Sequence, residues 1–137
     1  MLENSKHIII VGAGIAGLTA AISLRHYGIR ASIYERSPEI ITAGAGIQLS
    51  PNANRVLSRI GVLKEISSVS IRCHGVKVFD YKSNRQLALF DYMKFKGNDL
   101  FYFCHRADLV GVLYAACKKL EIPVYFNKKL EKIVNRK

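Results

Sequence analysis

The sequence predicts an α/β fold that starts with a β-α-β unit, and three observations in its N-terminal part predict it. Residues 7–11 include four consecutive β-branched residues, which is typical of a short buried strand. Residues 15–27 follow a glycine-rich turn and carry apolar side chains at helical spacing. Residues 29–35 alternate apolar and polar side chains, which indicates a second strand. Together they span about 30 residues, the usual size of a β-α-β motif.

The rest of the chain predicts more helices and strands, separated by turn residues. Gly28 and Gly61 are suited to end helices, and Ser83-Asn84 separates two alternating segments as in a hairpin. The predicted elements are a loop over residues 37–46, a helix from Pro51 or Asn52 to Ile60, a hairpin over residues 76–89, a helix over residues 108–120 and a strand over residues 124–126.

The charge of the chain is strongly positive, with 21 basic and 10 acidic residues and a formal net charge of +11. Such a charge attracts polyanions. No aromatic RNA-binding motif is interleaved with the basic residues, so we expect a solvated surface and no nucleic-acid partner. Much of the excess lies near the C-terminus, at Lys118, Lys119, Lys128, Lys129, Lys132, Arg136 and Lys137.

The cysteines predict neither disulfides nor a metal site. Cys73, Cys104 and Cys117 are far apart in the sequence and form no C-x-x-C pair. Reduced thiols are typical of a cytoplasmic protein, which is the location we expect. The apolar run over residues 8–24 resembles a signal peptide, but glycines interrupt it and Arg25 ends it before the ~20 residues of a membrane span.

The glycine-rich turn fits the pattern G-x-G-x-x-G, with Gly12, Gly14 and Gly17 at the glycine positions. In this pattern the first glycine allows a tight turn, the second lets a pyrophosphate approach the backbone, and the third lets helix and strand pack closely. The N-terminus of the helix offers free N–H groups and partial positive charge to phosphates. The sequence therefore predicts a Rossmann-like nucleotide site.

An acidic residue completes this pattern. Glu35 ends the second predicted strand, 18 residues beyond Gly17, where a carboxylate can accept hydrogen bonds from the ribose of an adenosine. A 2′-phosphate would be repelled, which disfavours NADP at this site. The alternative is a surface glutamate beside Arg36. The pattern itself leaves FAD and NAD open.

Two later segments carry a resemblance to a known family. Residues 44–53, GAGIQLSPNA, and residues 105–109, HRADL, resemble segments of class A flavoprotein monooxygenases of the salicylate hydroxylase-like branch. The resemblance extends over about residues 8–134. It implies FAD as cofactor, NAD(P)H as co-substrate and a small aromatic or related substrate that is hydroxylated with O₂.

The resemblance also implies which residues contact FAD. Arg106 would contact it from the start of a helix, where a guanidinium can direct two donors at phosphate or ribityl oxygens. The alternatives are an exposed arginine at Arg106, simple loop flexibility at Gly44 and Gly46, and a helix cap at Asn52. The full set of implied cofactor-binding residues is Gly12, Gly14, Ala16, Gly17, Glu35, Arg36, Gly46 and Arg106.

Family members are much longer than this chain, which shapes the expected domain organisation. We expect residues 1–137 to be the N-terminal part of an FAD-binding domain, so that the Rossmann-like fold is incomplete. Residues 75–103 or so would form an inserted β-hairpin region, the first strands of the substrate-facing sheet. The expected function is an FAD-dependent monooxygenase, truncated and inactive alone. The alternatives are an NAD-binding dehydrogenase or reductase domain and a non-catalytic nucleotide-binding remnant.

Overall fold

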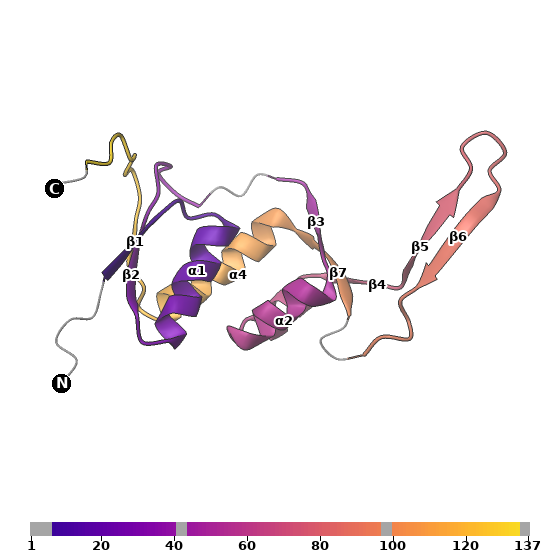
Figure 1. Ribbon diagram of the computed structural model, residues 1–137, viewed down its shortest axis with the longest axis horizontal. Helices are drawn as coiled ribbons and strands as arrows, with labels where there is room; N and C mark the ends of the chain where they lie inside the picture. The colour runs from indigo at the N-terminus through magenta and orange to yellow at the C-terminus, as the bar shows by residue number, and fades with distance from the viewer. Residues whose placement is uncertain (1–6, 41–43, 97–99, 135–137) are drawn as a thin grey trace. The chain divides into compact units, whose positions relative to one another are not determined.

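The computed structural model describes residues 7–40, 44–96 and 100–134 (Figure 1). The chain divides into two compact units. The first comprises Met1–Gly44 and Arg106–Lys137, and the second comprises Ala45–His105. Each unit has its own sheet, and the glycine-rich turn belongs to the first.

The first unit is a parallel sheet with two helices against it. The strands lie in the order β1-β2-β8, and β1 and β2 pair in parallel from His7↔Arg30 to Val11↔Tyr34. Helices α1 and α4 lie side by side next to the sheet (Figure 1). The elements of this unit are β1 (His7–Val11), α1 (Ile15–His26), β2 (Arg30–Tyr34), α4 (Arg106–Lys119) and β8 (Val124–Tyr125).

The core of the first unit consists of apolar side chains from both helices and the sheet. Cys117 is buried in it, where its thiol donates to the Leu18 carbonyl oxygen at 3.8 Å, and burial raises the thiol pKa to about 11. The prediction that residues 7–11 form a buried strand is wrong as to burial: β1 lies at the edge of the sheet, and its Ile9 and Val11 are 64% and 55% exposed. The largest fully buried side chains of this unit are Leu18, Ile22, Ile33, Leu109, Leu113 and Cys117.

The second unit contains an antiparallel sheet and a separate hairpin. The sheet has the strand order β3-β7-β4, and β5 pairs with β6 with an irregularity between Val78 and Phe79. Ile66 of α3 is fully buried. The elements are β3 (Gly46–Leu49), α2 (Pro51–Arg59), α3 (Leu63–Ser68), β4 (Ile71–Cys73), β5 (Gly75–Phe79), β6 (Gln86–Asp91) and β7 (Phe101–His105).

The structure confirms the β-α-β unit, the helix at Pro51, the hairpin and the C-terminal helix and strand as elements. The predicted loop over residues 37–46 overlaps β3 at Gly46, and its residues 41–43 lie outside the described part of the chain. Asn52 is not the helix cap: Ser50 occupies that position, and Pro51 takes the first helical position, where its missing N–H costs nothing. Strands β3, β4 and β7 and helix α3 were not predicted.

Membrane-spanning helices, disulfides and metal sites can be sought among the described residues. None of the helices there combines the length and the apolar character that a membrane-spanning segment requires. The three cysteines are buried and unpaired, and the described side chains form no cluster of His, Cys, Asp and Glu suited to a metal ion.

Candidate nucleotide site

The turn between β1 and α1 depends on glycine at its first position. Gly12 has φ of +99°, a conformation that costs a side chain about 1–3 kcal/mol. Its N–H donates to the Tyr34 carbonyl oxygen at 2.8 Å, so β1 stays paired with β2 up to the point where the chain turns. The turn therefore starts at the carboxyl ends of two parallel strands, the edge at which α/β sheets bind ligands.

The third glycine lets the start of α1 approach this turn. A Cβ atom at Gly17 would collide with the backbone carbonyl oxygen of Gly12 and would lie 3.2 Å from Cγ2 of Ile10. The first contact is with backbone, which cannot rotate away as a side chain can. Gly17 thus has the packing role that the motif predicts.

The second glycine has open space instead. A Cβ atom at Gly14 would meet no other atom within 4 Å, and Gly14 is the N-cap residue of α1 with φ of −81°. The first helical hydrogen bond runs from Leu18 N–H to the Gly14 carbonyl at 3.0 Å, which leaves the amides of Ile15, Ala16 and Gly17 without an acceptor in the helix. The first turn holds no acidic residue, so an anion would meet free N–H donors and the positive end of the helix dipole.

Glu35 lies directly after β2 and interacts with the glycine turn through its side chain. Its Oε2 accepts a hydrogen bond from Ala13 N–H at 2.7 Å, and its Oε1 accepts one from Ser37 N–H at 2.9 Å. The Ser37 amide is the largest cause that lowers the pKa of Glu35; partial burial opposes it, and the Ala13 amide and the charge of Arg36 also lower it. The carboxylate is therefore ionised at neutral pH.

Three segments that are distant in the sequence line one small cavity. Gly14, Glu35 and Arg106 line it together, which places the first residue of α4 beside the glycine turn. A Cβ atom at Gly44 would lie 2.8 Å from Cδ of Arg106, so a larger residue at Gly44 would displace this arginine. The residues that line the cavity are Ala13, Gly14, Glu35, Glu39, Ile40, Arg106 and Val110.

Three of these lining residues, Glu39, Ile40 and Val110, were not predicted from the sequence. Val110 lies one helical turn after Arg106, so the position of Arg106 could have pointed to it. Glu39 and Ile40 lie in a loop without periodicity, and no local pattern marks them. Five sequence-selected residues do not line this cavity. Gly12, Ala16 and Gly17 lie in the turn and at the start of α1, Arg36 is exposed beside Glu35, and Gly46 belongs to the second unit, where it pairs with His105.

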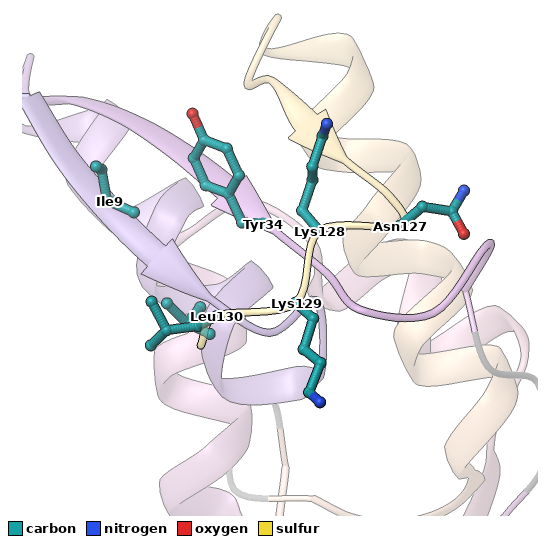
Figure 2. Close-up of a pocket in the computed structure, with 7 residues that line it drawn as sticks. Ile9, Tyr34, Asn127, Lys128, Lys129 and Leu130 are labelled. Carbon is teal, nitrogen blue, oxygen red and sulfur yellow. The ribbon is translucent and has the colours of Figure 1, made fainter. Parts of the chain in front are cut away.

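A larger cavity of about 360 Å³ lies over exposed side chains of the sheet (Figure 2). Figure 2 shows Ile9 and Tyr34 on the strands and Lys128 and Lys129 on the segment that follows β8. Its walls are largely apolar, and it includes none of the motif glycines and neither Glu35 nor Arg106. This cavity is therefore distinct from the predicted nucleotide site.

The sequence of the chain matches a known domain family and named enzymes. The family model described as "FAD binding domain" matches residues 5–136. The chain is 36% identical to 3-amino-4-hydroxybenzoate 2-monooxygenase of Streptomyces cremeus, over 80% of this chain and 28% of that enzyme. It is 35% identical to 3-hydroxybenzoate 6-hydroxylase 1 of Aquipseudomonas alcaligenes, over 83% of this chain and 30% of that enzyme.

The fold matches solved structures as well. The tetrameric form of 2-methyl-3-hydroxypyridine-5-carboxylic acid oxygenase has a TM-score of 0.79 and 27% identity, over 90% of this chain and 32% of that one. The chain thus spans about a third of the length of these relatives. Since the family model covers almost the whole sequence, the chain belongs to the FAD binding domain family of aromatic-ring monooxygenases and corresponds to their N-terminal region.

Proposed function

We propose that this chain holds the ADP half of FAD as the N-terminal region of a flavin-dependent aromatic-ring hydroxylase. The observation that carries the proposal is the cavity in which Gly14, the ionised carboxylate of Glu35 and Arg106 meet at the N-terminus of α1. A pyrophosphate needs free donors and positive charge, and a ribose needs a hydrogen-bond acceptor.

Each part of the cofactor has a fitting group in this site. The pyrophosphate would lie over Gly14, where no Cβ atom occupies the space, and would accept hydrogen bonds from the first amides of α1. A ribose hydroxyl would donate to Glu35. Arg106 would contribute a fixed positive charge from the start of α4. When bound, FAD would supply the redox chemistry between NAD(P)H, O₂ and the organic substrate.

The named relatives support a substrate class. Two of them are named for 3-amino-4-hydroxybenzoate and 3-hydroxybenzoate, which are both hydroxylated aromatic acids. We propose a substrate of this class for the whole protein, with NAD(P)H as co-substrate and a cytoplasmic location. The unpaired thiols of Cys73, Cys104 and Cys117 support a reducing compartment.

The second candidate function is an NAD-binding dehydrogenase or reductase domain, which the same β-α-β unit would serve. The geometry of Gly44 and Arg106 favours FAD over this alternative. A simple NAD-binding unit does not require an arginine packed tightly against a glycine of a distant loop, whereas the resemblance assigns this arginine to FAD.

Calorimetric titration of the purified chain with FAD, ADP and NAD tests the proposal. We expect FAD and ADP to bind, and Glu35→Ala to weaken both by about 1–3 kcal/mol, because a hydrogen bond to a charged group is lost. Glu121→Ala is the matched control, since Glu121 precedes β8 at the opposite end of the parallel sheet. Tighter binding of NAD than of FAD would favour the dehydrogenase. Unchanged affinity in Glu35→Ala would refute the assigned ribose contact.

A further inference from the structure

The Glu35 carboxylate is bound to backbone amides of the protein at both of its oxygens. Ala13 N–H donates to Oε2 at 2.7 Å and Ser37 N–H donates to Oε1 at 2.9 Å. Hydrogen bonds between an amide and an ionised carboxylate are stronger than those between neutral groups. The side chain therefore ties the turn before α1 to the turn after β2.

The backbone of Glu35 is held as firmly as its side chain. Its N–H donates to the Tyr125 carbonyl oxygen at 2.8 Å, and its own carbonyl accepts from Lys128 N–H at 2.8 Å. The backbone of Glu35 is thus fixed by hydrogen bonds to β8 and to the segment that follows it, and the carboxylate extends from this fixed backbone. Among the described residues, the hydrogen bond from Ala13 N–H is the contact with the glycine turn that depends on the side chain of residue 35.

We propose that Glu35 is a positioning residue for the glycine turn: it holds the Ala13 amide and so sets the turn in its anion-binding form before a nucleotide arrives. The identity of the nucleotide rests on the function proposed above. This role is compatible with a ribose contact, because each carboxylate oxygen has two lone pairs and the backbone uses one on each.

The burial of Ala13 explains why the turn needs this acceptor. Ala13 is only 5% exposed, so water is a poor substitute for Glu35, and a buried N–H without a partner is costly. Glutamine has nearly the same shape but only one acceptor oxygen. In Glu35→Gln that oxygen can accept from Ala13 or from Ser37 but not from both, whereas Glu35→Leu has no acceptor and removes both bonds.

Amide hydrogen exchange in the full chain without ligand, followed residue by residue by NMR, tests the proposal. We expect Ala13 to be protected in the unmodified chain and to exchange at least about tenfold faster in Glu35→Leu, since local opening controls the rate. Ile33 should be unchanged, because its N–H donates to the Pro123 carbonyl oxygen. Glu121→Leu makes the same chemical change at the other end of the sheet and should leave Ala13 protected.

Two results would overturn this role for Glu35. One is equal exchange of Ala13 in the unmodified chain and in Glu35→Leu. The other is an unprotected Ala13 in the unmodified chain, which decides the question even if the variant fails to fold. Loss of protection at Ile33 would reveal such a failure.

Inorganic pyrophosphate separates positioning from ribose binding, because it has no ribose. If Glu35 only contacts ribose, Glu35→Leu removes a negative charge near the anion and should strengthen pyrophosphate binding. If Glu35 positions the turn, binding should weaken, by at least about threefold, because the site is no longer preorganised. Stronger binding would contradict the proposal. Failure of FAD to bind the unmodified chain would refute the proposed function and leave the exchange result intact.

Discussion

Alanine substitutions at Gly17 and Gly14 should separate the fold from the nucleotide site. A Cβ atom at position 17 collides with the Gly12 carbonyl oxygen and lies 3.2 Å from Cγ2 of Ile10, whereas one at position 14 meets nothing within 4 Å. The first substitution should therefore destabilise the first unit. The second should leave the fold intact and place a methyl group where we expect the pyrophosphate.

The magnitudes follow from two opposing effects at Gly17. Overpacking costs about 1–3 kcal/mol, and more when backbone must move. Alanine recovers about 1 kcal/mol because it favours the helix more than glycine does. We expect a net loss of about 2 kcal/mol for Gly17→Ala. For Gly14→Ala we expect a loss below about 1 kcal/mol, since Gly14 is an N-cap residue without a side-chain hydrogen bond.

Thermal and urea unfolding followed by circular dichroism would measure the stability of both variants, and calorimetric titration would measure FAD binding. A 2 kcal/mol loss lowers the Tm of a domain of this size by roughly 4–12 °C. Gly28→Ala is a useful reference, because a Cβ atom there meets nothing within 4 Å but φ is +71°, so any loss comes from backbone conformation alone. A Gly17→Ala variant as stable as the unmodified chain would refute the packing argument. A Gly14→Ala variant with normal FAD affinity would refute the placement of the pyrophosphate.

Three other predictions concern pH, nucleic acid and catalysis. The folded chain lowers the pKa of Glu35 from its ordinary value of 4.5. The ionised carboxylate therefore stabilises the fold above that pH, and this stabilisation is lost as the pH falls through the folded pKa. Unfolding measured between about pH 3 and 6 should show a smaller loss of stability in Glu35→Gln than in the unmodified chain. The basic segment with Lys128, Lys129 and Lys132 should bind DNA or RNA weakly and lose that binding steeply with salt, and tight binding at physiological salt in fluorescence anisotropy would contradict a solvated surface. The 137-residue chain alone should hydroxylate no phenolic acid, because the proposed site would hold only the ADP end of FAD and catalysis needs the reactive end held against the substrate. Mass spectrometry of products against a free-flavin control would reveal any hydroxylation.

The elements that could be predicted from the sequence are those with a local signal. Residues 7–11 are continuously apolar after His7 and residues 15–27 have helical spacing, so β1 and α1 were recognised within one residue of their ends. Strands β3 and β4 were missed because they have only four and three residues, and β7 because its five residues, FYFCH, show no clear alternation of apolar and polar side chains. Ile47 pairs with Cys104, and Ile71 pairs with Phe103. Such pairing between distant segments cannot be predicted from either segment alone.

The sequence by itself determined the class of site: three glycines, a helix and a carboxylate, at the spacing that a dinucleotide requires. Only the tertiary structure decided which groups meet there. It brought Arg106 to the cavity with Gly14 and Glu35, and it added Glu39, which no motif marks. It also decided that Glu35 binds the Ala13 amide, because parallel pairing of β1 and β2 brings the carboxyl ends of the two strands together. A motif records the spacing of residues along the chain, whereas hydrogen bonds depend on distances that only folding creates.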